Sequence, residues 1–76
     1  MKTAVTITFT RDEAVVLFEL LTRLDANATA LFEHPAEERI VWKIQGLLES
    51  ELVEPFQSNY HEILNNARAN VDLPET

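Results

Sequence analysis

The chain has 76 residues, no cysteine and a formal net charge of −7, with thirteen Asp and Glu residues against six Lys and Arg. This length fits one small domain, 1–76, and without cysteine the chain can form no disulfide and has no thiolate chemistry. The basic residues are scattered singly. Nucleic-acid binding and attraction to anionic lipid both need gathered positive charge, so the sequence predicts neither.

The distribution of apolar residues excludes two further classes. They make up 46% of the chain, which is ordinary for a globular domain, and their runs are too short to span a bilayer. The first ten residues alternate with threonine and lack an apolar block followed by a small-residue cleavage site, so no signal peptide is expected. We therefore expect a cytoplasmic globular protein with no membrane partner.

Residues 3–10 have the pattern of a half-buried β-strand. Val5, Ile7 and Phe9 alternate with threonines, and β-branched residues at period two are typical of a strand with one apolar side. A helix should start directly after it. Thr10 and Glu13 are three residues apart, the spacing of a capping box in which each side chain binds the backbone N–H of the other.

The predicted helix 11–24 has an unusually wide apolar arc. Val16 and Leu20 extend its main stripe sideways, and this leaves few positions for water. An amphipathic surface helix needs only a stripe of about 100°. We therefore expect this helix to be covered on two sides, with the second cover supplied by another chain. Residues 25–34 should form a loop, held to the core by Leu31 and Phe32.

The longest helical pattern covers residues 35–54. Pro35 suits a first helical turn, and Pro55 ends the helix because the residue before a proline is disfavoured in helical conformation. We expect the rest of the chain to be organised around this helix. Its apolar stripe is formed by Ile40, Val41, Ile44, Leu47, Leu48 and Leu52.

Trp42, Gly46 and Val53 lie away from that stripe, and two interpretations of them stay open. Glycine costs about 1 kcal/mol relative to alanine inside a helix, so a close approach beside the indole would explain it. In one interpretation Trp42 covers the edge of the core with its N–H in water, and Gly46 makes room for the last helix. In the other, the pair anchors an interface, where tryptophan is a common hot-spot residue.

The last helix is predicted over residues 59–70, capped by Ser58, and a frayed tail should follow at 72–76. The predicted fold is therefore mostly α. It is a small three-helix bundle with one N-terminal β-strand, and becomes α+β if that strand pairs within the chain or across a dimer.

No catalytic or metal-binding motif emerges. His34 and His61 lie far apart without HExxH or EF-hand spacing, and neither Ser50 nor Ser58 lies in a nucleophile-elbow pattern. A single glycine cannot build a phosphate-binding loop. We expect no enzyme activity, no cofactor and no bound metal.

The function that remains is a small acidic protein-interaction module that self-associates. We expect a homodimer joined through residues 3–10, because a lone strand needs a partner and this chain offers no good one. The alternative is an acidic inhibitor or neutralising partner, such as an antitoxin, an immunity or anti-defence protein or a nucleic-acid mimic, supported by the charge of −7. The expected interface residues are Val5, Ile7, Phe9, Val16, Leu20, Trp42, Gly46 and Val53.

Overall fold

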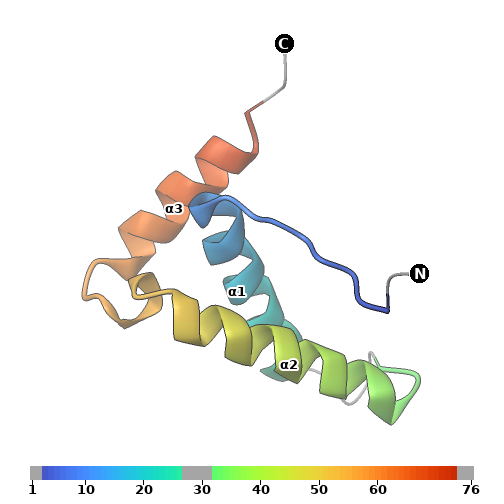
Figure 1. Cartoon of the computed structure of the whole chain (residues 1–76). Helices are drawn as coiled ribbons and strands as arrows, with labels where there is room; N and C mark the ends of the chain where they lie inside the picture. The colour runs from blue at the N-terminus through green and yellow to red at the C-terminus, as the bar shows by residue number, and fades with distance from the viewer. Residues whose placement is uncertain (1–2, 27–31, 74–76) are drawn as a thin grey trace.

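The computed structural model describes residues 3–26 and 32–73, and it is mostly helical. Its elements are α1 (Arg11–Ala26), α2 (Pro35–Glu51), the short 3₁₀ helix η2 (Glu54–Phe56) and α3 (Tyr60–Val71) (Figure 1). A small bundle of three helices was predicted, and the structure agrees with it. Within the described residues, no helix combines the length and apolar character needed to cross a membrane.

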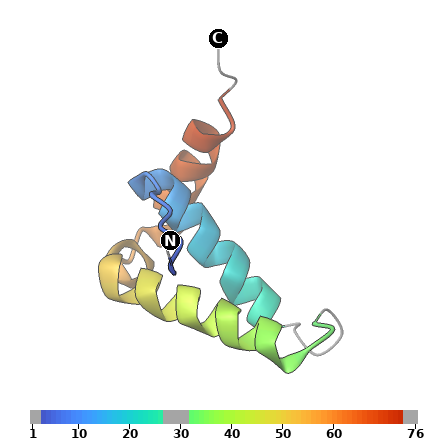
Figure 2. The ribbon, with the colours of Figure 1, turned by 45° about the vertical axis from the view of Figure 1, so that its right-hand side comes forward.

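The helix at the centre of the fold is α1. Both α2 and α3 pack against it, as seen from two directions in Figures 1 and 2, and α2 and α3 make few contacts with each other. The wide apolar arc of α1 is therefore covered on two sides within the chain. The expectation that residues 35–54 organise the fold was wrong, because α2 has no buried residue at all.

The core is small and combines residues from distant parts of the chain. Val15 and Ala67 are each 1% exposed, and the cluster contains only apolar side chains. Its members are Ala14, Val15, Leu52, Leu64 and Ala67, with Val16, Phe18, Leu48 and Tyr60 packed against them. Two polar links join α1 to α3 beside this core. The Tyr60 hydroxyl donates to Glu19 Oε1 (3.0 Å), and Asn70 Nδ2 donates to Asp12 Oδ2 (3.0 Å).

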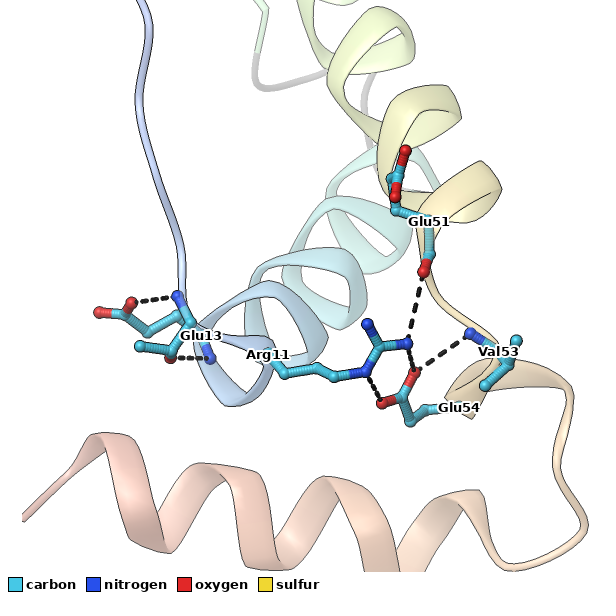
Figure 3. A network of polar contacts seen from close by, with 6 residues as sticks. Arg11, Glu13, Glu51, Val53 and Glu54 are labelled. Atoms are coloured by element: carbon cyan, nitrogen blue, oxygen red, sulfur yellow. Dashed lines mark hydrogen bonds and ion pairs between the residues drawn. The ribbon is translucent and has the colours of Figure 1, made fainter.

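The capping box at the start of α1 is confirmed. Thr10 N–H donates to Glu13 Oε1 (2.8 Å), and Glu13 N–H donates to Thr10 Oγ1 (3.1 Å) (Figure 3). These bonds satisfy donors that the first helical turn would otherwise leave without partners. The start of α1 is thereby fixed at Arg11, where the extended segment before it ends.

Four helix boundaries differ from the prediction, and two of them are small extensions: α1 runs to Ala26 and α3 to Val71. α2 ends at Glu51 because Leu52 becomes extended (φ −104°, ψ 134°), which carries its side chain into the core. α3 begins at Tyr60, and Asn59, not Ser58, occupies the N-cap position without a side-chain cap. Of the residues predicted to anchor the loop, Phe32 is half-buried and Leu31 lies outside the described residues. Residues 74–76 of the predicted tail also lie outside them.

Residues 3–10, here called the arm, are extended but form no strand. No backbone hydrogen bond joins residues 3–9 to any other described residue. The arm leads into the start of α1 and has no strand beside it among the described residues (Figures 1 and 2). The strand predicted there is not confirmed, because a β-strand needs a neighbouring strand to bond with.

The molecule is more open than a compact monomer of its size. Its accessible surface is 6304 Å² for 8.7 kDa, whereas a typical folded monomer of that mass exposes about 4700 Å². The radius of gyration is 14.1 Å, against about 11 Å for a compact domain of this length. The side chains that the fold leaves exposed include the apolar residues Val5, Ile7, Ile40 and Leu47.

Candidate functional site

The arm presents apolar side chains that nothing in the described chain covers. Val5 is 90% exposed, Ile7 69% and Phe9 44%, so exposure falls toward the start of α1. The arm has no charged residue in a chain of net charge −7. Alternation places these three side chains on one side of the extended backbone. The arm is therefore an uncharged apolar edge, which favours contact with another apolar surface.

A pocket of about 300 Å³ lies at the root of the arm. It is lined by Phe9 of the arm, by Ala14 of α1, and by Leu48 and Glu51 of α2. The remaining lining residues are Thr10, Arg11 and Leu52. The lining is largely apolar, and Phe9 is the member of the arm's apolar side that reaches it.

An apolar surface continues from this pocket along both helices. Ile40, Ile44 and Leu47 precede Glu51 at spacings that place all four on one side of α2. Ile40 and Leu47 are 58% and 59% exposed. On α1, Leu17 and Leu21 follow Ala14 in the same way. We call this surface the trough; it consists of Leu17, Ile40, Ile44 and Leu47, while Ala14 and Leu21 beside it are already buried within the chain.

Arg11 joins the start of α1 to the segment that follows α2 (Figure 3). Its guanidinium donates to both carboxylate oxygens of Glu54, through Nε at 2.7 Å and Nη2 at 3.0 Å, and to the Glu51 carbonyl at 3.3 Å. The same Glu54 carboxylate accepts the Val53 N–H at 3.1 Å. The start of α1 is thus tied to the end of α2, where both helices line the pocket.

The electrostatics of this junction follow from that pairing. The hydrogen bond from Arg11 is the main cause that lowers the pKa of Glu54, and the same bond raises the pKa of Arg11. Arg11 is exposed, so the pair positions the helices more than it stabilises them. Elsewhere, burial and then the hydrogen bond to Glu19 raise the pKa of Tyr60 to about 12.

Trp42 and Gly46 lie on a different side of α2 from the trough. The Trp42 indole N–H donates to Asp25 Oδ1 at 2.7 Å, although the side chain is 52% exposed. The interpretation that placed this N–H in water was therefore wrong. The other half of that interpretation, in which Gly46 makes room for the last helix, was also wrong. No described atom lies within 4 Å of the position that a Cβ would take at Gly46. An interface at this position stays a prediction.

The other expected interface residues are dispersed. Val16 is half-buried against the core, Leu20 is 42% exposed on α1, and Val53 is 59% exposed beyond the end of α2. The sequence reasoning assigned Ile40 and Leu47 to the core and so missed the trough. One signal could have found it: the apolar stripe predicted on the helix 35–54 covers more of the helix surface than a single neighbouring helix can bury.

No arrangement in the described part of the chain resembles a catalytic or metal centre. Residues 3–26 and 32–73 contain no group of three or more His, Asp or Glu side chains able to hold a metal ion. Every buried side chain among them is apolar. No protein-family model matches the chain, and neither a curated protein nor a solved structure matches it. The candidate site is therefore the arm together with the trough.

Proposed function

We propose that this protein is a small acidic interaction module without catalytic activity, and that it self-associates as a homodimer. The observation that carries the proposal is the excess of accessible surface, 6304 Å² against about 4700 Å² for a compact monomer. The difference, about 1600 Å², is larger than the roughly 800 Å² that each partner buries in a standard interface. Exposed apolar side chains of the arm and of α2 contribute to that surface.

In the proposed dimer the two arms pair as antiparallel strands about a two-fold axis. Pairing would give residues 3–9 the backbone hydrogen bonds that they lack within the described chain. It would also join the two copies where they carry no charge, so that two chains of net charge −7 can approach without strong local repulsion. With a two-fold axis, the same surface of each copy forms the interface, so each arm supplies hydrogen-bond partners for the other.

Sedimentation at micromolar concentration tests the proposal. The wild-type chain should sediment as a dimer, and Ile7→Pro should sediment as a monomer because proline has no N–H to donate. Ile7→Val is the matched control, since it keeps a β-branched apolar side chain and should remain dimeric. A monomeric wild type would refute the proposal, and so would a dimer that tolerates Ile7→Pro.

The alternative proposal, an acidic inhibitor or neutralising partner, has support in the net charge of −7. The positions of the carboxylates favour it less. Glu54 is paired with Arg11, while Glu49 and Glu51 lie on opposite sides of α2 by helical spacing. A mimic of a nucleic-acid backbone needs its charges along one continuous stripe. Charges spread around a helix are typical of a surface selected for solubility.

A further inference from the structure

We infer that the trough between α1 and α2 receives the arm of a second copy of this chain. The inference rests on the proposed homodimer and deepens it by naming the surface beneath the paired arms. The trough residues are Leu17, Ile40, Ile44 and Leu47, with the pocket beside Phe9 at one end.

The chain's own arm does not occupy this surface. Only Phe9 of its apolar side lines the pocket, while Ile7 and Val5 are 69% and 90% exposed. Leu47, one turn from the pocket residue Glu51, is 59% exposed. The apolar side of the arm and the apolar side of α2 are therefore both uncovered in one copy. Two copies can cover both surfaces at once.

Antiparallel pairing brings the second arm to the pocket. If the pair is centred on Ile7, Val5 of the second copy lies directly opposite Phe9 of the first. Residues directly opposite one another share a face of the ribbon, so this Val5 points to the same side as Phe9. Phe9 lines the pocket, so Val5 of the second copy faces the pocket as well.

Length and charge also fit this occupant. The eight extended residues of the arm span about 26 Å, and the stripe from Ile40 to Glu51 spans about 16 Å along its helix. The arm therefore reaches along the whole stripe. The arm contains only threonine, alanine and apolar residues, and the trough is apolar. The charged groups at the pocket end, Arg11 and Glu54, already neutralise each other in an ion pair.

Site-specific cross-linking tests the contact, and the absence of native cysteine makes the labelling clean. A tagged Val5→Cys chain is mixed with an untagged Glu51→Cys chain and treated with a short bismaleimide. We expect a covalent heterodimer of tagged and untagged chains. Glu49→Cys is the matched control, because it removes the same charge on the opposite side of α2 and should give little heterodimer.

A second measurement tests the trough without cysteine. Leu47→Gln should raise the dimer dissociation constant by at least about tenfold, because a side chain buried only in the dimer is made polar. Phe56→Gln is its control: Phe56 is 70% exposed in η2, outside the trough, and its loss should leave the constant unchanged.

The outcomes separate this inference from the proposed function. A dimer that cross-links equally through positions 49 and 51, or that tolerates Leu47→Gln, overturns the trough contact and leaves the homodimer standing. The trough contact between copies is also overturned if a Val5→Cys, Glu51→Cys double variant cross-links within one chain and the mixture gives no heterodimer. That result would mean that the arm folds onto its own helices. A wild-type chain that is monomeric throughout overturns both.

Discussion

Replacing Gly46 should stabilise the protein. Gly46 lies inside α2, is exposed and has no described atom within 4 Å of the position that a Cβ would take. Alanine is favoured over glycine in a helix interior by about 0.8–1 kcal/mol, and nothing at this position opposes that gain. Gly46→Ala should therefore raise the free energy of unfolding by about that amount. For a domain of this length, the melting temperature should rise by roughly 4–8 °C.

Thermal and urea unfolding at one fixed protein concentration measure this effect. Gly46→Ser is a graded control that should give about half the gain, because serine lies between alanine and glycine in helix propensity. Gly46→Leu probes the space further out and should also stabilise, with no change in sedimentation. Destabilisation by leucine, or loss of the dimer, would refute the reasoning and would place a partner against Trp42 and Gly46.

Three further predictions follow from local contacts. Thr10→Ala should cost about 1 kcal/mol, measured as a lower urea midpoint, since it removes the N-cap of α1; an unchanged midpoint would contradict the role of the cap. Tyr60 is the only tyrosine, so absorbance should place its ionisation near pH 12 instead of about 10. Because the pKa of Tyr60 is higher in the folded than in the unfolded state, the protonated phenol stabilises the fold. This contribution is complete below about pH 10 and is lost as the pH rises toward 12. A titration midpoint near pH 10 in the folded protein would count against burial of the phenol. Neither zinc nor a chelator should shift the melting temperature. A ligand at a hundred times its Kd would add about 2.7 kcal/mol to the free energy of unfolding. A clear rise of the melting temperature with zinc would therefore reveal a metal site.

Features that depend on neighbouring residues could be predicted from the sequence. The capping box of Thr10 and Glu13 needs only two side chains three residues apart at a helix start, and the structure contains both of its hydrogen bonds. The wide apolar arc of α1 likewise indicated cover on two sides, but the second cover was expected from another chain, whereas α2 and α3 of the same chain provide both. In both cases the physical cause lies within one helix or one turn.

The role of α2 could not be predicted in this way. Periodicity identifies which side chains share a face, but it contains no information on which element will cover that face. α2 has a long regular pattern, yet only α1 packs along it, and the side with Ile40 and Leu47 is left exposed. Half of the candidate site, the arm, was therefore expected from the sequence, while the other half was assigned to the core.

Contacts between residues that are distant in the sequence could not be predicted either. The bond from Trp42 to Asp25 joins positions 17 residues apart, and the pairing of Arg11 with Glu54 joins positions 43 apart. Each depends on how two helices cross and on where α2 ends. The early end of α2 depends in turn on burial of Leu52, which requires α1 and α3 to be in place.

The composition of the core has a consequence for synthesis on the ribosome. Val15 is covered by side chains that include Leu64 and Ala67, so α1 emerges long before the residues that shield it. At about 5–20 residues per second, the delay is on the order of seconds, far longer than a helix needs to form. Throughout that interval the nascent chain carries an apolar helix and an uncharged arm with nothing to cover either. The core around Val15 can therefore be completed only after Leu64 and Ala67 have been synthesised.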